Sequence, residues 1–470
     1  MKQDSSTSML PSERRATFGL AGIFALRMLG LFLLLPVLTL HASEYTDSTP
    51  LLIGLALGAY GLTQAFLQIP FGMLSDRFGR KRVIAAGLIL FALGSVYAAL
   101  ADTLVEVVIG RALQGAGAIA AATMALLADL TREENRTKAM ATFGMSIGFA
   151  FMLAIVLGPL LVGWIGLSGL FWMTGVFALL GLVVLAKIVP HATHSHTRRD
   201  AVALRSELGS VLMNPQLRRL DFGILVLHLV LTALFVVVPL SLLHEAGLPK
   251  EQHGWAYFGV MIASVAIMFP LVLAAERGGR MKQVFVGAIF TLAISMLLLW
   301  QLPHSLWFLL GMLVLFFAAF NVLEATLPSL ISKTAPVASK GTAMGVYSSS
   351  QFFGAFLGGA LGGWVLGAWG EASVYLLCAA LLIVWGVYAL TMAPPARVST
   401  RVVRVGVMTK VRAQQVAVEL REIDGIVEAV VLAEEGVAYV KYEPASLDEA
   451  ALAGWVSNPA REPGEAAVAT

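Results

Sequence analysis

The sequence predicts an all-α membrane protein followed by a small α+β domain at the C-terminus. Hydrophobic residues make up 58% of the 470 residues and charged residues 13%, whereas soluble domains average roughly 25% charged residues. The mean hydropathy is +0.82. Apolar runs of about 20 residues, long enough to cross the hydrocarbon of a bilayer, recur from Thr17 to Met392. A charged cluster within this region recurs later in the chain, and the composition becomes that of a soluble domain after Pro395.

Hydropathy predicts about twelve transmembrane spans in two groups of six. A polar linker, expected to be cytoplasmic, separates an N-terminal half of residues 1–189 from a C-terminal half of residues 218–392, and this linker covers residues 190–217. The spans are expected at residues 16–41, 50–74, 81–101, 103–130, 138–163 and 168–189, and then at 218–243, 252–275, 282–301, 304–331, 341–368 and 371–392.

The C-terminal region is predicted to form a separate cytoplasmic domain after a short linker at residues 393–400. Its periodicity alternates between strand and helix. The order βαββα suggests a ferredoxin-like domain without its last strand, over residues 401–457. Residues 458–470 are expected to be disordered. The predicted elements are a strand at 401–407, a helix at 411–423, a hairpin at 426–432 and 437–442, and a helix at 447–456.

The distribution of charge predicts the orientation in the membrane. Residues 1–396 contain 24 Lys and Arg against 18 Asp and Glu, while residues 397–470 contain 8 against 11. Of those 24 bases, 21 lie at the N-terminus or in even-numbered loops, which places these segments in the cytoplasm by the positive-inside rule. We therefore expect a multi-pass membrane protein, in contact with the lipid bilayer, with both termini cytoplasmic. The basic excess is a topology signal and does not indicate nucleic-acid binding.

A compact cluster of charges and glycines, Gly72–Arg82, lies between the second and third predicted spans. Charged side chains there are expected at the membrane surface, because burying them in hydrocarbon costs several kcal/mol. The acid, base and second glycine recur 200 positions later, at Glu276, Arg277 and Gly279, and Arg280 follows. Duplicated clusters of this kind indicate a transporter built from two related halves.

Three segments resemble motifs of the major facilitator superfamily. Residues 72–82 are similar to the loop motif G-x-L-x-D-R-x-G-R-K, residues 111–117 to the fourth-helix motif R-x-x-Q-G-x-G, and residues 129–136 to the end of that helix and its loop. The resemblance implies the fold of that family, twelve transmembrane helices in two six-helix halves, and a proton-coupled exporter of the bacterial inner membrane. The fifth-helix antiporter motif is matched at Gly158, Pro159 and Gly163, whereas Ala154 and Val162 replace two of its glycines.

The resemblance also implies that the charged cluster gates transport. In that family's mechanism Asp76 docks against the start of the eleventh helix, while Arg77 and Arg80 pair with Asp129 and latch the halves in the outward-facing state. The alternative is a solvated loop that merely obeys the positive-inside rule. The implied gating residues are Gly72, Asp76, Arg77, Gly79, Arg80, Lys81, Asp129 and Arg136, and the second-half counterparts are Glu276, Arg277, Gly279 and Arg280.

Several polar residues lie within predicted spans, where they need a partner or an aqueous cavity. Arg27 is interpreted as a cavity residue, with a buried ion pair as the alternative. Arg111, with Gln114 one turn later, is assigned to proton coupling by tuning a nearby acid, or to snorkelling. Glu324, with Asn321 on the neighbouring turn, is the leading proton carrier, against a neutral structural role. His228 is more typical of a packing residue.

These observations favour a proton-driven antiporter that exports small molecules by alternating access. Nutrient uptake by symport and a non-transporting membrane sensor are the alternatives. Nothing indicates an enzyme or a bound cofactor, and the coupling ion is expected to be H⁺. The C-terminal domain resembles heavy-metal-associated domains, but Lys410 and Ala413 replace the metal-binding cysteines, so no metal is expected. That domain is instead expected to bind a partner, a second copy of itself or the cytoplasmic face of the transporter.

Overall fold

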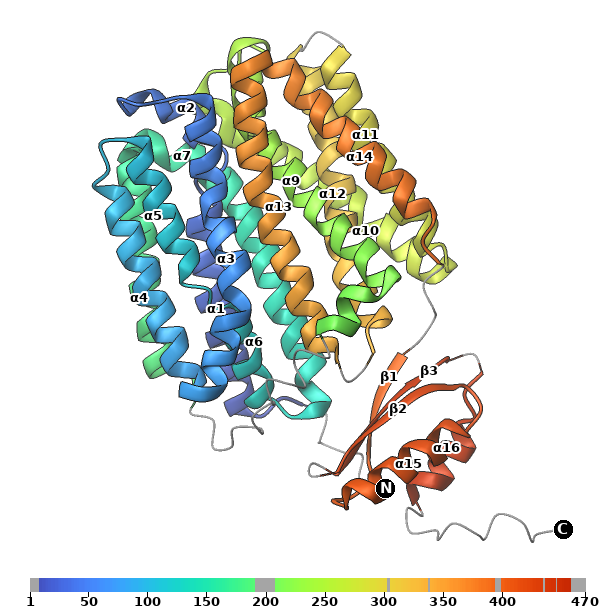
Figure 1. The fold of residues 1–470 in the computed structure, drawn as a ribbon. Coiled ribbons are helices and arrows are strands. Elements are labelled where there is room, and N and C mark those ends of the chain that lie inside the picture. Colours follow the sequence, from blue (N-terminus) through green and yellow to red (C-terminus); the bar gives the residue numbers. More distant parts are fainter. Residues whose placement is uncertain are drawn as a thin grey trace, which may run out of the picture.

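The computed structural model describes residues 8–190, 208–301, 305–336, 339–393, 399–433, 436–444 and 446–457. A bundle of long helices carries a small α/β domain at one end (Figure 1). We call this end of the bundle domain-proximal and the opposite end domain-distal. Most of the predicted linker 190–217 and the tail 458–470 lie outside the described residues.

The first half of the bundle contains six membrane crossings. Its longest helix, α7, includes non-helical backbone at Gly166, with φ 67° and ψ 178°, so its 50-residue apolar stretch is long enough to cross twice. The helices are α1 (Pro11–Phe32), α2 (Leu38–His41), η2 (Ala42–Glu44), α3 (Pro50–Phe78), α4 (Arg80–Ala99), α5 (Leu104–Ala116), α6 (Ala120–Asp129) and α7 (Glu133–Lys187).

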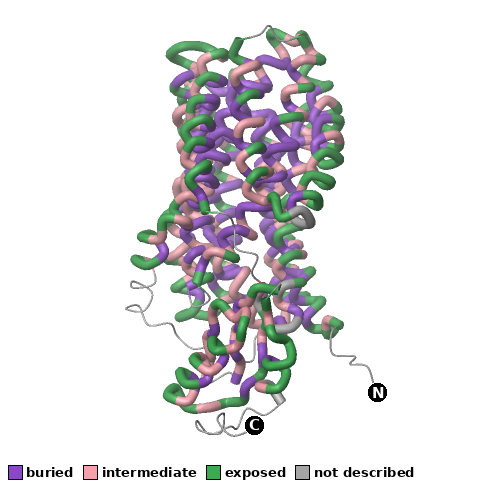
Figure 2. The backbone as a smooth tube through the Cα atoms, turned by 90° about the vertical axis from the view of Figure 1, so that its right-hand side faces the viewer, coloured by how far each residue is buried: buried purple, intermediate pink, exposed green. Residues whose placement is uncertain are grey.

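The second half follows the same plan. Its helices are α9 (Pro215–His244), η3 (Lys250–Gln252), α10 (His253–Gly278), α11 (Met281–Gln301), α12 (Leu306–Thr334), α13 (Lys340–Trp369) and α14 (Glu371–Leu390). Within the described residues, eleven helical stretches are long and apolar enough to span a membrane. With the double crossing of α7, they account for the twelve predicted spans. Buried residues follow the inside of the bundle and exposed ones its outer faces (Figure 2).

The fourth span differs from the sequence prediction, which was one continuous helix over 103–130. The structure breaks it into α5 and α6 at residues 117–119. Gly117 packs against the backbone of Gly87 so closely that a Cβ would overlap the Gly87 carbonyl. At Gly117 ψ is 49°, outside the helical range. The break is therefore set by a tertiary contact, which hydropathy does not report.

The C-terminal domain confirms the predicted order of strands and helices. Strands β1 (Ser399–Arg404), β2 (Ile426–Leu432) and β3 (Val437–Tyr442) form an antiparallel sheet in the order β1-β3-β2. Helices α15 (Lys410–Arg421) and α16 (Glu449–Ser457) complete it. Its core contains Val416, Leu420 and Val440, so the domain has a hydrophobic core of its own.

The two halves pack closely through glycines of α3 and α13. Cβ atoms added to Gly54 and Gly61 would overlap the carbonyl oxygens of Gly359 and Phe352. Glycine lets two helix backbones approach in this way. Other contacts between the halves lie at the same domain-distal level: Thr39 Oγ1 donates to the Phe235 carbonyl at 3.2 Å. The halves are thus closed against each other in the domain-distal part of the bundle.

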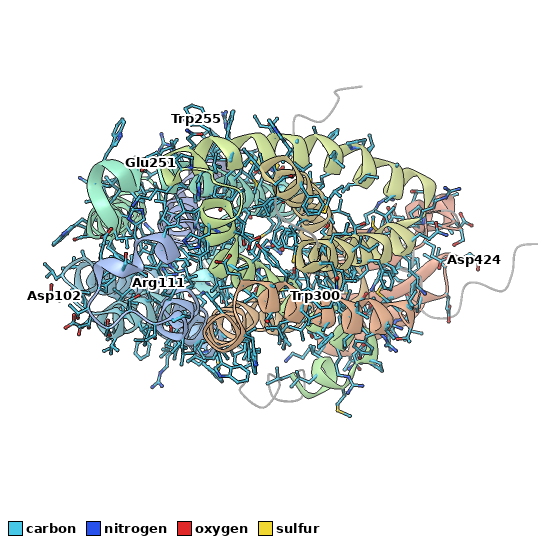
Figure 3. The ribbon with its side chains drawn as sticks, turned by 90° about the horizontal axis from the view of Figure 1, so that it is seen from above. Asp102, Arg111, Glu251, Trp255, Trp300 and Asp424 are labelled. Atoms are coloured by element: carbon cyan, nitrogen blue, oxygen red, sulfur yellow. The ribbon has the colours of Figure 1, made fainter. Side chains whose placement is uncertain are left out.

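Gly54→Ala is expected to open this contact. The new methyl would overlap the Gly359 backbone, and overpacking of this kind typically costs about 1–3 kcal/mol. Spin labels on cysteines introduced at Asp102 and Glu251, exposed positions of the two halves at the domain-distal end (Figure 3), should move apart in a Cys378→Ser background.

Gly259→Ala on α10 is the matched control, because a Cβ there meets nothing within 4 Å. Equal label distances in Gly54→Ala and in the parent protein would contradict the predicted role of the glycine contact.

Candidate functional site

The charged cluster at the domain-proximal end joins three helices of the first half. Helix α3 ends at Phe78, Gly79 turns the chain with φ 95°, and α4 begins at Arg80. Arg80 Nε donates to Asp129 Oδ2 at 2.7 Å, and Arg80 also pairs with Asp76. Its Nη1 donates to Ser75 Oγ at 3.0 Å. The structure therefore brings together Asp76 near the end of α3, Arg80 at the start of α4 and Asp129 at the end of α6.

The other predicted gating residues lie around this cluster. The guanidinium of Arg77 stacks over the Phe78 ring at 5.4 Å. Lys81 Nζ donates to the Val189 carbonyl at 2.5 Å, just past the end of α7. A Cβ on Gly72 would lie 3.3 Å from Ala121, so α3 and α6 are close there. These contacts are all within the first half, and the docking of Asp76 on the start of α13 stays a prediction.

A second anchor at this end was missed by the sequence analysis. Glu13 is buried on α1, and its carboxylate accepts hydrogen bonds from Arg132 and Asn135, at 2.7–3.1 Å. It ties the start of α1 to the loop between α6 and α7. The only sequence signal was an acid in the first turn of a helix, which is common and usually solvated.

The C-terminal domain contacts both halves through strand β3. Arg136 Nη1 of α7 donates to Tyr439 Oη at 3.2 Å, and its Nη2 donates to the Ala128 carbonyl at 3.4 Å. Lys441 Nζ donates to the Ala335 carbonyl, at the end of α12, at 3.4 Å. Arg136 of α7 thus contacts both the end of α6 and the C-terminal domain.

The counterpart cluster of the second half lies partly outside the described residues. The side chains of Glu276 and Arg277 belong to this undescribed part. Gly279 has φ 63°, in the left-handed region that favours glycine, and the Arg280 N–H donates to the Ala275 carbonyl at 3.1 Å. The turn between α10 and α11 therefore resembles the glycine turn between α3 and α4.

Arg111 is fully buried among the helices of the first half (Figure 3). Its Nε donates to the Ala56 carbonyl at 3.1 Å, its Nη1 to Gln114 Oε1 at 3.0 Å, and its Nη2 to the Leu57 carbonyl at 3.4 Å. Gln114 Nε2 donates in turn to Ser95 Oγ at 2.9 Å. Arg111 therefore does not snorkel to the interface: neutral groups of α3 and α5 hold it within the bundle.

Arg27 is also buried inside the first half, at 1% exposure. Its Nη2 donates to Gln64 Oε1 and to the Gly117 carbonyl, both at 2.9 Å. Gly117 is the residue at which the fourth span breaks, so the broken helix supplies an acceptor that a continuous helix would use internally. Both partners of Arg27 are neutral groups of the first half. Among the described contacts, Arg27 therefore neither faces the second half nor forms an ion pair.

The second half brings together three titratable or polar residues from three helices. Gln351 Nε2 of α13 lies 2.8 Å from His228 Nε2 of α9 and donates to Glu324 Oε1 of α12 at 3.3 Å. Glu324 Oε2 lies 3.9 Å from His228 Nε2. An amide nitrogen has two protons, so Gln351 donates to both partners when His228 carries its own proton on Nδ1. His228 therefore belongs to a polar cluster rather than to apolar packing alone.

Glycines of α13 set this arrangement. Cβ atoms on Gly354 and Gly358 would overlap the carbonyls of Leu225 and Leu229, so α13 lies directly against α9. Gln351 is one turn before Gly354, and His228 lies between the two leucines. The close packing therefore fixes the register that brings the amide to the imidazole.

Further polar residues extend the cluster along α9, α12 and α13. Asn321 is one turn before Glu324 on α12. Asp221, which the sequence analysis missed, is buried two turns before His228, and its Oδ1 has no hydrogen-bond partner among the described residues. The Tyr347 hydroxyl of α13 is also buried and has no hydrogen-bond partner among the described residues. Asp221 escaped notice because it lies near the start of a span, where acids usually reach water.

The polar cluster of Glu324, His228 and Gln351 lies beside the contact between the halves. Phe320, one turn before Glu324, stacks on Phe151 of the first half with ring centroids 6.1 Å apart. Phe352, the residue after Gln351, meets Tyr60 of the first half edge-on at 6.0 Å. A change in the hydrogen bonds of Glu324 or Gln351 therefore occurs next to side chains that hold the halves together.

The residues of the partial antiporter motif lie in α7, in different surroundings. A Cβ on Gly158 would overlap the Leu33 carbonyl, so the connection between α1 and α2 packs on α7 there. Pro159 lies inside the helix and removes one backbone donor. Gly163 faces open space. Only Gly158 of the three is therefore required by a close approach.

The chemistry available to these groups is proton and ligand binding. In the described part of the chain, no group of three or more His, Cys, Asp or Glu side chains is arranged to hold a metal ion. Cys378 is buried and free. The clusters combine carboxylates, amides, an imidazole and guanidinium groups, which change protonation or hydrogen-bonding partners without forming covalent bonds.

Comparisons with known proteins agree with this architecture. Residues 20–231 and 220–423 match the family described as Major Facilitator Superfamily. The chain is 46% identical to "Inner membrane transport protein YajR" of Escherichia coli strain K12, over 93% of this chain and 95% of that protein. It is 25% identical to "Multidrug resistance protein MdtH" of Proteus mirabilis strain HI4320, over 72% of this chain and 84% of that protein.

A solved structure shows the same fold at low sequence identity. A bacterial homologue of the human lysosomal transporter Spinster superposes with a TM-score of 0.66 at 14% identity, and the match covers 82% of this chain and 97% of that chain. Together with the family match and the relatives, which are transporters and not enzymes, this makes the chain a multi-pass inner-membrane member of the major facilitator superfamily.

Proposed function

We propose that this transporter exports small molecules in exchange for protons by alternating access. The observation that carries the proposal is the cluster of Glu324, His228 and Gln351, which places a carboxylate next to the contact between the halves. An acid inside a membrane bundle is expensive to retain and is by default a functional residue. Glu324 is placed where a change in its protonation would alter its hydrogen bonds with Gln351 and His228.

Protonation of Glu324 would exchange hydrogen bonds within the cluster. The ionised carboxylate only accepts, and it accepts from Gln351 at 3.3 Å. A protonated Oε2 becomes a donor, and His228 Nε2 at 3.9 Å is the nearest acceptor shown. It would compete there with the Gln351 amide, which now occupies that nitrogen at 2.8 Å. Release of Gln351 would loosen the adjacent contact of Phe352 with Tyr60.

The charged cluster at the domain-proximal end is proposed to latch the opposite state. The halves are closed at the domain-distal end, and Arg80, Asp76 and Asp129 pair within the first half alone. Docking of Asp76 on the start of α13 would require the halves to approach at the domain-proximal end. If that end is cytoplasmic, as the distribution of Lys and Arg predicts, the docking of Asp76 on α13 forms in the outward-facing state, whereas the pair of Arg80 with Asp129 is already present here.

The direction of transport is supported by a relative. The MdtH protein carries the name of a multidrug resistance protein, in line with export of small molecules. Uptake by symport remains the second candidate, because the fifth-helix motif retains only Gly158, Pro159 and Gly163. Proteoliposomes with an imposed pH gradient of either sign separate the two directions, once a deletion strain screened against toxic compounds and metabolites has supplied a substrate.

The C-terminal domain is proposed to be ferredoxin-like and to regulate the transporter. Its strand order β1-β3-β2, with antiparallel neighbours, is that of a ferredoxin-like sheet without the fourth strand. Its contacts to Arg136 and Ala335 join the two halves at the domain-proximal end. The proposed role is a brace that limits the rate at which the halves move.

Glu324→Gln is predicted to abolish transport driven by a pH gradient while substrate-for-substrate exchange continues. The glutamine mimics the size and neutrality of the protonated acid but cannot release a proton. Uptake into proteoliposomes with and without a pH gradient measures both activities, and Glu44→Gln in an exposed loop is the control. Proton-driven transport at the parent rate in Glu324→Gln would exclude Glu324 as the carrier.

Asp76→Asn and Asp129→Asn are predicted to separate gating from stability. Asp76 is 37% exposed and Asp129 7% exposed, and both bind Arg80. Asp76→Asn should reduce transport at least tenfold with little change in thermal unfolding, because Arg80 keeps its buried partner. Asp129→Asn should destabilise the protein by about 1–3 kcal/mol, since it leaves a buried polar contact unsatisfied.

Transport assays and thermal unfolding of the same purified variants check this prediction. Normal transport by Asp76→Asn would remove the latch from the mechanism, even if insertion and stability were unaffected.

Removing the brace is predicted to accelerate transport. Tyr439→Phe deletes the hydroxyl that accepts from Arg136, and Lys441→Met deletes the donor to the Ala335 carbonyl. The double variant should raise the turnover rate severalfold at unchanged substrate affinity, as measured in proteoliposomes. Glu422→Gln on the same domain serves as the control. A lower or unchanged turnover rate would contradict a restraining role.

A further inference from the structure

The guanidinium of Arg27 has hydrogen-bond donors that no described residue uses. Its Nη2 donates twice, to Gln64 and Gly117. Its Nε and Nη1 are buried and have no acceptor among the described residues. Buried polar groups are normally satisfied, so each exception calls for an explanation. Here two nitrogens of one permanent cation, with three N–H groups between them, are left over in the interior of the first half.

Two further polar groups of the first half, both on α3, are buried and without a partner among the described residues. They are the Tyr60 hydroxyl and Gln68 Nε2. Both amide oxygens are already occupied: Gln64 Oε1 accepts from Arg27, and Gln68 Oε1 accepts from Gln64 Nε2 at 3.2 Å. The rings of Phe24, Tyr60 and Phe91 lie 5.2–6.0 Å from the guanidinium carbon and attract the cation. They offer no lone pair to its N–H groups.

The local field is positive as well. Arg111 lies over the same Tyr60 ring at 5.5 Å, and its own donors point to carbonyls and Gln114. Helix α6 begins at Ala120, directly after the break whose Gly117 carbonyl binds Arg27, and a helix N-terminus carries a partial positive charge. No described carboxylate forms an ion pair with either arginine. Two buried cations without a counter-charge favour a bound anion.

We propose that the first half contains a binding site for a small monovalent anion at Arg27. The anion accepts hydrogen bonds from Arg27 Nε and Nη1, and the Tyr60 hydroxyl is the third donor. Arg27, Tyr60 and Gln68 are each at most 2% exposed, so the bound group is small: a halide, or the carboxylate end of a larger molecule. The site lies in the opposite half from Glu324, and it does not depend on the proposed exchange with protons.

Anion-dependent stability of the purified full-length protein tests the site. Chloride replaces gluconate at constant ionic strength, and the thermal midpoint should rise with chloride and saturate, because a ligand that binds only the folded state stabilises it by mass action. Bromide should act likewise. Arg27→Gln should abolish the rise, whereas Arg15→Gln, an exposed position on the same helix, should keep it. A rise that persists in Arg27→Gln, or no rise in the parent protein with chloride, bromide or acetate, overturns the proposal.

Two further measurements test the site without the Arg27→Gln variant, in case that variant does not fold. Tyr60→Phe keeps the ring and removes only the hydroxyl, so the apparent affinity for chloride should fall roughly 2- to 10-fold; an unchanged affinity would contradict the third donor. Crystals grown in bromide should show an anomalous peak beside Arg27 Nε and Nη1, and its absence at a saturating concentration, together with no effect of acetate on stability, overturns the site. Acetate distinguishes the sources: an Arg27-dependent rise with acetate but not chloride identifies a carboxylate ligand.

Discussion

The structure depends on the need to satisfy every polar group inside a membrane bundle without water. Hydrocarbon offers no hydrogen-bond partners, so a buried charge must use the protein's own backbone and side chains. The first half meets part of this need by breaking its fourth span, which frees the Gly117 carbonyl for Arg27, while Arg27 Nε and Nη1 have no partner among the described residues. The second half meets it with an amide shared between Glu324 and His228. The departures from regular helix and the polar clusters therefore arise from one constraint.

Close helix packing makes these solutions possible. Glycines let α13 approach α3 on one side and α9 on the other, through Gly359 and Gly354 respectively. One helix therefore carries both the contact between the halves and the amide that binds Glu324. A larger residue at either glycine would move Gln351 away from its partners. The packing of the halves and the polar cluster around Glu324 are thus linked by the register of a single helix.

The sequence was sufficient for the features that depend on local pattern. Hydropathy predicted the spans and the break near Gly166, and alternation predicted the strands of the C-terminal domain. The sequence analysis identified Glu324 and His228 separately. Their shared contact with Gln351 depends on the approach of α13 to α9, which the sequence does not report. The break at Gly117 and the neutral partners of Arg111 were not predictable, because both rest on backbone contacts between helices distant in the sequence. Asp221 was overlooked for its position near the end of a helix.

The two halves, related by their repeated motifs, differ in the sign of the charge in their interior polar clusters. The first cluster contains the buried Arg27 and Arg111, and the second contains the partly exposed Glu324 and the buried Asp221. Both clusters reach the same aromatic contact: Tyr60 stacks with Arg27 at 5.4 Å and meets Phe352 at 6.0 Å, and Phe352 follows Gln351. Coupling between sites needs an element with two arrangements that both sites bias. This contact forms only while the halves are closed around it, so it is the element through which a proton in one half and an anion in the other would affect each other.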